Sequence, residues 1–191
     1  MPLHPLPRGH VGAVVTALTM SRPPDPGPLP ASELVVEPWP EVDLDRYRAL
    51  FRRVGARWLW YSRLVMSDPE LRAALGEVHV VRGPDGGDAG MIELEREPGA
   101  CRIRFLGLVP ELTGRGHGRW LIDAALRLAW QEGVEQVELY TCSLDHPAAM
   151  PAYLRAGFTA VSRSFESFPD PRLAGLLPAD CAPQVPLVEP S

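Results

Sequence analysis

The sequence contains no lysine and no asparagine, so its charged bases are all arginine. A P-loop ends in Gly-Lys-Ser/Thr, and the absence of lysine excludes that phosphate-binding motif. Cysteine is scarce as well: Cys101, Cys142 and Cys181 are far apart, odd in number and without a Cys-x-x-Cys pair. They predict reduced thiols rather than a disulfide framework. Histidines at metal-binding spacing are also missing, so we expect no metal site.

Long apolar runs and an excess of positive charge are missing too. The longest N-terminal apolar run, Val11 to Met20, is too short to span a bilayer and is not followed by a convincing cleavage region. The net charge of -5 gives no support to a basic face for nucleic acid. We therefore expect a cytoplasmic chain that binds neither a membrane nor a nucleic acid.

The length of 191 residues suits one domain with a sizeable core. We divide it into an N-terminal arm (1–10), a folded domain (11–166) and a proline-rich C-terminal tail (167–191). Period-two and period-three-to-four patterns predict an α/β (α+β) fold, a mixed, mostly antiparallel sheet with helices on both faces. The expected strands are Val11 to Met20, Leu34 to Glu37, Glu77 to Arg82, Ala89 to Glu97, Cys101 to Val109, Val134 to Tyr140 and Phe158 to Phe165. The expected helices are Asp43 through Val54 with Tyr47, Leu50 and Phe51 on its apolar face, a helix starting at Ser67, Gly116 to Glu132, and Pro147 to Ala156.

A glycine-rich loop, Gly114-Arg115-Gly116-His117-Gly118-Arg119, separates the strand pattern ending near Val109 from an apolar helix. Alternate glycines leave the backbone N–H groups uncovered, so these donors can converge on an anion at the positive end of the helix. The pattern predicts a pyrophosphate site. A Rossmann fingerprint fits poorly, because Glu138, at about the expected spacing, lies inside the next strand.

Two segments resemble one known family. Val109 to Leu121 is similar to motif A of the GNAT superfamily of acyl-CoA-dependent N-acetyltransferases, whose pattern is Gln/Arg-x-x-Gly-x-Gly/Ala. His146 to Phe158 is similar to the family's Asn-x-x-Ala-x-x-x-Tyr-x-x-x-Gly-Phe helix and following strand. Two motifs in the right order are far more specific than either alone. The resemblance covers roughly Glu77 to Glu166 and implies the GNAT fold.

The resemblance also implies the cofactor, acetyl-CoA. In the family, a bulge splays the motif A strand from the next parallel strand, and pantetheine inserts between them; Gly107 is the expected bulge here. Thr113 replaces the family's Gln or Arg, which predicts weaker anchoring of the phosphates. His146 replaces the usual asparagine and could bond the CoA arm, act as a base or cap a helix. The expected cofactor-binding residues are Leu108, Val109, Gly114, Arg115, Gly116, His117 (through its backbone only), Gly118, Arg119 and His146.

Resemblance places Tyr153 at the family's general-acid position. A phenol with a pKa of ~10 can give a proton to the departing thiolate, although a tyrosine in this pattern could also be core. The base is less defined, because Arg102 stands where many members carry a carboxylate, and arginine cannot take a proton at neutral pH. Glu93, nearer mid-strand, is the first choice, and Glu95 and Asp145 are the alternatives.

The acceptor side is predicted from the aromatic stretch Arg57 to Arg63. These rings could line a substrate pocket, as the first helices do in the family, or pack in the core. We expect Tyr61 and Glu95 to bind substrate. We expect a bacterial N-acetyltransferase that moves acetyl to a primary amine of a small molecule or peptide by direct attack. The alternatives are a non-catalytic CoA-binding sensor and an acyltransferase for longer acyl chains. The proline-rich termini could embrace a partner chain in a homodimer.

Overall fold

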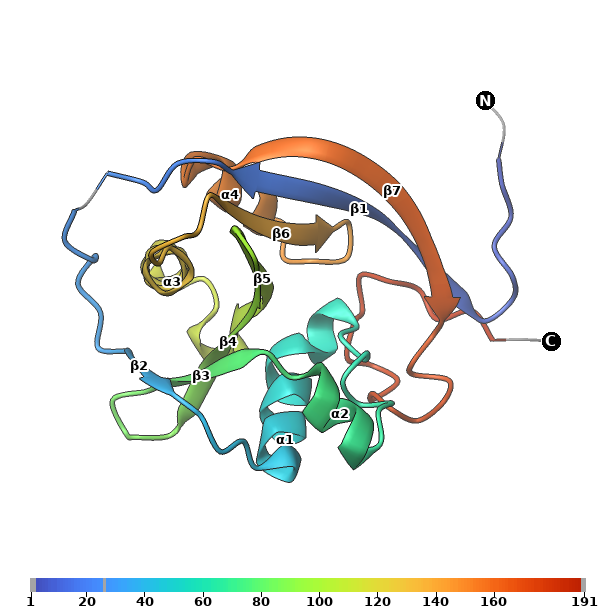
Figure 1. Ribbon diagram of the computed structural model, residues 1–191. Coiled ribbons are helices and arrows are strands. Elements are labelled where there is room, and N and C mark those ends of the chain that lie inside the picture. Colours follow the sequence, from blue (N-terminus) through green and yellow to red (C-terminus); the bar gives the residue numbers. More distant parts are fainter. Residues whose placement is uncertain (1–2, 26, 190–191) are drawn as a thin grey trace.

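A computed structural model describes residues 3–25 and 27–189, and shows one curved seven-stranded sheet with helices on both sides (Figure 1). The strand order is β2-β3-β4-β5-β6-β1-β7. The strands are β1 (His10–Met20), β2 (Val35–Pro38), β3 (Glu77–Arg82), β4 (Asp88–Glu97), β5 (Ala100–Leu108), β6 (Gln136–Cys142) and β7 (Thr159–Pro169). The helices are α1 (Leu44–Gly55), α2 (Asp68–Ala74), α3 (His117–Ala129) and α4 (Ala149–Arg155), with short 3-10 turns at Ala56–Trp58 and Pro110–Leu112.

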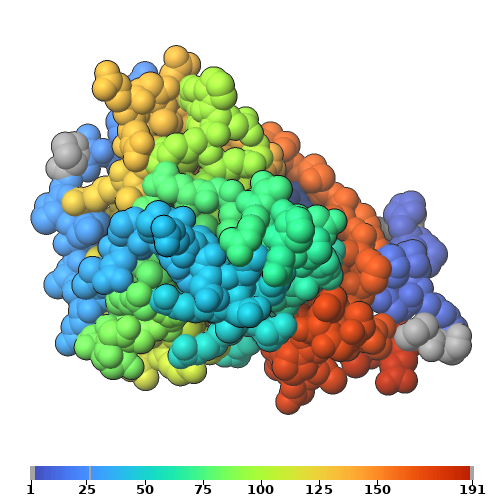
Figure 2. Space-filling view, turned by 60° about the horizontal axis from the view of Figure 1, so that its bottom comes forward, coloured from blue at the N-terminus to red at the C-terminus, as the bar shows by residue number. Residues whose placement is uncertain are grey.

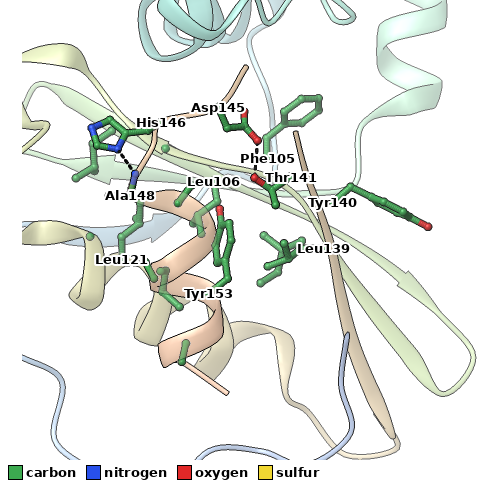
Figure 3. Close-up of a pocket in the computed structure, with 18 of the residues that line it drawn as sticks. Phe105, Leu106, Leu121, Leu139, Tyr140, Thr141, Asp145, His146, Ala148 and Tyr153 are labelled. Atoms are coloured by element: carbon green, nitrogen blue, oxygen red, sulfur yellow. Dashed lines mark hydrogen bonds between the residues drawn. The ribbon is translucent and has the colours of Figure 1, made fainter. Parts of the chain in front are cut away.

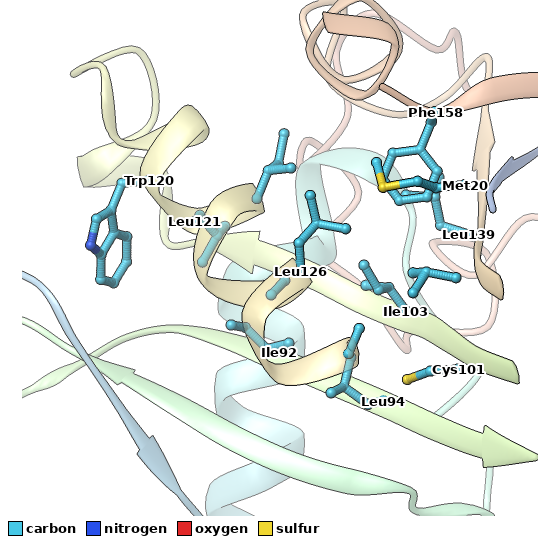
Figure 4. Close-up of a cluster of buried hydrophobic side chains, with 14 of the residues drawn as sticks. Met20, Ile92, Leu94, Cys101, Ile103, Trp120, Leu121, Leu126, Leu139 and Phe158 are labelled. Carbon is cyan, nitrogen blue, oxygen red and sulfur yellow. The ribbon is translucent and has the colours of Figure 1, made fainter. Parts of the chain in front are cut away.

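Helices α1 and α3 cover opposite faces of the sheet. Neighbouring residues of a strand point to opposite faces, so their contacts show which helix lies on which side. On β4, Met91 packs in the same cluster as Phe51 of α1. The next residue, Ile92, packs in the cluster that holds Leu126 of α3 (Figure 4). The predicted mixed sheet with helices on both faces is therefore confirmed.

The apolar face predicted for α1 is confirmed as well. Asp43 caps this helix by accepting a hydrogen bond from the Arg46 N–H at 2.8 Å, which satisfies one of the donors that a helix start leaves free. The side chains predicted to face the core are all buried: Tyr47, Leu50, Phe51 and Val54.

Strand β1 lies between β6 and β7 and is antiparallel to both, although it is the first element of the chain. Val15 pairs with Cys142 of β6, and Ala13 pairs with Glu166 of β7. The strand itself was predicted, but its neighbours were not, because alternation within a strand says nothing about its partners. In Figure 1 the blue β1 ribbon runs beside the orange β7 ribbon.

Two predicted ends, those of α3 and β7, were wrong by more than two residues. Helix α3 ends at Ala129 and not at Glu132, because Trp130 takes an extended conformation while its N–H still reaches the Leu126 carbonyl. Strand β7 runs on to Pro169, since β1 continues to pair with it as far as His10.

The C-terminal segment after β7 packs against the domain. Leu177 and Ala182 are buried with Leu59 and Phe168 in a small cluster of their own, and Figure 2 shows the red C-terminal segment beside α1 and α2 on one face of the molecule. Asp170 and Arg172 form a buried ion pair at 2.7 Å. No helix in the described part of the chain is long and apolar enough to cross a membrane.

Candidate active site

Strands β5 and β6 begin as a parallel pair and then separate. They pair only from Ala100–Gln136 to Ile103–Leu139. Beyond Ile103, β5 follows β4 alone, and the Val109 N–H bonds to the Ala89 carbonyl of that side. The predicted gap between the two strands is therefore confirmed.

The bulge that accompanies the gap lies at Arg104, not at Gly107 as predicted. Glu93 pairs with Phe105 and Leu94 pairs with Ile103, so Arg104 is the extra residue of β5. Gly107 pairs regularly with Met91. Its missing side chain serves another purpose, because a Cβ there would lie 2.5 Å from a methyl group of Val54 on α1.

A cavity of about 1820 Å³ runs through the sheet at this gap. Both alternating sets of β6 side chains line it, and because they point to opposite faces the cavity reaches both sides of the sheet. On the α3 side it is lined by Leu108, Leu121, Leu139, Ala152 and Tyr153; on the α1 side by Trp58, Tyr61, Phe105, Tyr140, Cys142, Glu166 and Phe168. Figure 3 shows Tyr153, Leu121 and Leu139 lining the cavity.

The glycine loop lies at the α3 mouth of the cavity. Gly114 and Gly116 have φ angles of 79° and 87°, a left-handed conformation that glycine adopts without strain. A Cβ at either position, or at Gly118, would meet nothing within 4 Å, so the space over the backbone is open. Because the first turn of a helix leaves its N–H groups unpaired, this loop offers hydrogen-bond donors on the side of the open space.

Only some side chains of this loop line the cavity. Thr113 and Arg119 line the cavity together with the three glycines, whereas Arg115 and His117 do not. The His117 Nδ1 instead lies 3.5 Å from the Ser32 Oγ of the connector after β1. Arg119 is the cation of the loop that the structure brings to the cavity.

Of the two hydrophobic residues predicted to touch the cofactor, Leu108 lines the cavity and Val109 does not. Val109 is buried in the α1-side cluster, because β5 ends there and its side chain turns under the helix. Its placement corrects that part of the expected cofactor set.

Tyr153 of α4 faces the cavity, half-buried, with its ring edge-on to Phe158 at 6.1 Å. Burial, and then the negative charge of Asp145, raise the pKa of its phenol above the usual value. A raised pKa keeps the hydroxyl protonated at neutral pH, as a proton donor requires.

Asp145 lies in the turn between β6 and α4 and also lines the cavity. One carboxylate oxygen, Oδ2, accepts hydrogen bonds from the Thr141 hydroxyl at 2.8 Å and the Cys142 N–H at 2.9 Å (Figure 3). The other oxygen has no hydrogen-bond partner among the described residues. The carboxylate is thus fixed through one oxygen and free at the other.

His146 lines the cavity and bonds to the backbone just before α4. Its Nδ1 accepts a hydrogen bond from the Ala148 N–H at 3.0 Å, just before α4 begins. The imidazole also lies edge-on to Trp58, with ring centres 5.2 Å apart. The ring therefore joins the start of α4 to the aromatic stretch on the other side of the cavity.

Glu93, the first choice for the base, is not brought to the cavity. Its side chain is fully buried under α1, where it accepts a hydrogen bond from the Tyr47 hydroxyl at 2.5 Å and pairs with the guanidinium of Arg63. Strand β4 is not a solvated edge, because β2 and β3 lie outside it and α1 covers it. Both carboxylate oxygens are occupied, which corrects the expected role.

Of the two residues predicted to bind substrate, only one lines the cavity. Tyr61 lines the cavity, and its ring stacks on Phe168 with centres 5.0 Å apart. Glu95 lies outside the cavity lining and accepts hydrogen bonds from Arg102 and Arg104, each at 3.0 Å. Although burial opposes ionisation, these two arginines hold the pKa of Glu95 below its usual value.

Sequence reasoning missed the part of the wall contributed by β7. Glu166 and Phe168 line the cavity, and only the position of β7 beside β1 brings them there. The available signal was period-two alternation, which places both side chains on one face. Among the described residues, no group of three or more His, Cys, Asp or Glu side chains is placed to hold a metal ion.

Comparison with known proteins agrees with this geometry. Residues 32–158 match the family model described as "Acetyltransferase (GNAT) family". The mycothiol acetyltransferase of Clavibacter michiganensis subsp. michiganensis is 31% identical over 136 residues, covering 69% of this chain and 44% of that protein. The Clavibacter sepedonicus protein of the same name is 31% identical over 121 residues, covering 61% of this chain and 40% of its own. The chain thus spans less than half the length of these relatives.

Solved structures share the fold at low sequence identity. A GCN5-related N-acetyltransferase from Sphaerobacter thermophilus superposes with a TM-score of 0.57 at 19% identity, covering 85% of this chain and 52% of its own. The spermidine N-acetyltransferase of Vibrio cholerae, in complex with CoA and spermine, superposes with a TM-score of 0.54 at 19% identity. The match covers 72% of this chain and 96% of that protein. Since the family model covers most of the chain, including the glycine loop and α4, this protein belongs to the GNAT acetyltransferase family.

Proposed function

We propose that this protein transfers the acetyl group of acetyl-CoA to a primary amine by direct attack. The observation that carries the proposal is the cavity that crosses the sheet where β5 and β6 separate. Two substrates can enter it from opposite faces and meet at the crossing. Tyr153 and Asp145 both line the cavity that holds this meeting point.

Coenzyme A would occupy the α3 side. The unpaired N–H groups of the first turn of α3 would hold its pyrophosphate, with Arg119 adding a positive charge. The pantetheine arm would lie along Leu108 toward the gap, where β5 and β6 no longer bond to each other. The open space over Gly114, Gly116 and Gly118 fits an anion that approaches the backbone closely.

The amine would enter from the α1 side, past Trp58 and Tyr61. It attacks the thioester carbonyl as a free base, so an amide bond forms and the carbon–sulfur bond breaks. The nitrogen loses a proton to the free oxygen of Asp145, directly or through water, and the departing thiolate takes the proton of Tyr153. Solvent then returns the proton to the phenolate.

The names of the relatives support acetyl transfer as the reaction class. Both curated relatives are called mycothiol acetyltransferase, and a structural neighbour is a spermidine N-acetyltransferase. We assign neither acceptor to this chain. The match to mycothiol acetyltransferase covers less than half of that protein, and the likeness to the spermidine N-acetyltransferase shows the fold alone.

The test measures CoA binding and turnover separately. Titration calorimetry with CoA should show uptake, and a thiol-release assay with acetyl-CoA and a panel of primary amines should show turnover. Asp145→Asn keeps an acceptor for Thr141 and Cys142, and it should lower kcat by about 10²- to 10⁴-fold, the usual contribution of a general base. Absence of CoA uptake would overturn the proposal. Uptake without turnover would favour a CoA-binding sensor, and faster turnover with propionyl-CoA would favour a longer acyl group.

A further inference from the structure

The α1 side of the cavity has an unpaired acidic side chain. Glu166 lines the cavity, and it makes neither an ion pair nor a side-chain hydrogen bond with any residue that the structure describes. Three other carboxylates on this face of the sheet, Glu93 and Glu95 of β4 and Glu138 of β6, each have an arginine within ion-pair distance. Glu166 therefore stands apart from the structural ion pairs of the sheet.

The register of β7 fixes where this carboxylate points. Glu166 pairs with Ala13 and Phe168 pairs with Val11, and both partners are buried on the α1 side. Residues two apart share a face of the sheet, so Glu166 projects beside Phe168. The Phe168 ring in turn stacks on Tyr61. The carboxylate is thus next to the aromatic stretch that lines the acceptor entrance.

The negative charge of Glu166 raises the pKa of two neighbouring side chains. Burial raises the pKa of the Tyr61 phenol, and Glu166 adds to the increase. Burial and Asp145 raise the pKa of the Cys142 thiol to about 11, and Glu166 contributes again. These shifts agree with the placement that the strand register gives.

The two arginines of β5 on this face are already paired. Arg102 and Arg104 share Glu95, and Arg102 also reaches Glu138 at 3.3 Å, so two cations balance two anions. Of the charged residues that line the cavity, Asp25, Arg119, Asp123, Arg127 and Arg155 belong to the connector after β1 and to α3 and α4, and Arg104 is paired with Glu95. The carboxylates left are Asp145 and Glu166. Aromatic faces beside a carboxylate attract a cation, since the ring quadrupole and the charge act in the same direction.

We infer that Glu166 binds a second, protonated amino group of the acceptor, so that the preferred substrates are diamines or longer polyamine-like molecules. The inference rests on the proposed function, because it assigns a substrate class to the same cavity. The reacting amine is neutral when it attacks near Tyr153 and Asp145. The second group remains an ammonium ion at Glu166, between the ring of Tyr61 and the solvent.

The test compares matched amines on the wild-type protein. The series runs from 1,3-diaminopropane to 1,6-diaminohexane, each set against the monoamine of the same chain length, with acetyl-CoA saturating. At least one diamine should have a higher kcat/KM than its monoamine. Glu166→Gln should remove about 10- to 100-fold of that preference, as expected for a lost bond to a charged group, through KM and without changing the KM for acetyl-CoA. Glu166→Asp should retain part of it.

Glu132→Gln is the control, because Glu132 is exposed like Glu166 but lies in the turn after α3, outside the cavity lining. It should leave the diamine preference unchanged. Equal turnover of diamines and monoamines by the wild type, or an unchanged preference in Glu166→Gln, overturns the inference while the proposed function stands. If no amine is acetylated, the proposed function fails. Calorimetry of the same diamines on the CoA-loaded protein then tests the subsite alone: tighter diamine binding lost in Glu166→Gln supports it, and equal binding overturns it.

Discussion

The polar groups under α1 are bonded to one another, whereas those at the strand gap are partly free. Under α1, Glu93, Arg63 and Tyr47 form a closed cluster in which both carboxylate oxygens are bonded and no side chain reaches the cavity. At the strand gap, Asp145 is held through one oxygen only, and Tyr153 makes no hydrogen bond to another described side chain. The contrast separates polar residues that stabilise the fold from polar residues left free for a ligand. Both regions contain a carboxylate and a tyrosine, so matched substitutions can test the contrast.

The largest effect is expected for Tyr153→Phe. Removing the phenol leaves the thiolate without a positioned acid, so kcat should fall by about 10²- to 10⁴-fold. The melting temperature should change little, because the lost hydroxyl has no described side-chain partner. The measurement is steady-state turnover with acetyl-CoA and the best amine of the panel, with CoA affinity measured in parallel. Retention of more than a tenth of kcat would exclude the acid role.

Glu93→Gln should act on stability instead. It leaves the fully buried guanidinium of Arg63 without its counter-charge, and breaking such a pair costs about 3–5 kcal/mol. Urea unfolding measures the loss, and the fraction that remains folded should keep its kcat. Glu95→Gln is the control on the same strand face; its ion pairs are part-exposed, so it should cost under about 1 kcal/mol. A specific loss of kcat in folded Glu93→Gln would return Glu93 to the candidate bases.

Sequence reasoning located the elements of the site better than it located their side chains. The glycine loop and the Tyr153 helix were found because spacing survives in short motifs, and the gap after Ile103 followed from the family resemblance. Glu93 was misplaced because alternation gives the face of a strand but not what covers that face. Glu166 was missed because its position depends on β7 pairing with β1 across the length of the chain. Pairing between distant strands is set by tertiary packing, which local patterns do not encode.

Tyr47→Phe is the matched partner of Tyr153→Phe on the other face. It deletes the hydroxyl that donates to the buried Glu93 carboxylate at 2.5 Å, and a hydrogen bond to a charged group contributes about 1.5–3 kcal/mol. The unfolding free energy should fall by that amount while kcat and the CoA affinity stay at wild-type values. A drop in turnover equal to that of Tyr153→Phe, without a loss of stability, would contradict the division between the two faces.

The smallest effect separates the glycine loop from an ordinary turn. Gly116 and Gly133 have nearly the same left-handed φ, 87° and 85°, and a Cβ at either position meets nothing within 4 Å. Alanine should therefore cost each about 1–2 kcal/mol of stability, the penalty of a side chain in that conformation. Only Gly116 faces the cavity, so only Gly116→Ala should also weaken CoA binding, by about tenfold if a similar strain falls on the bound loop. Titration calorimetry of the two variants with CoA measures the difference. Equal CoA affinities would mean that the backbone of this loop does not hold the cofactor, since the two substitutions strain the chain alike and differ only in where they lie.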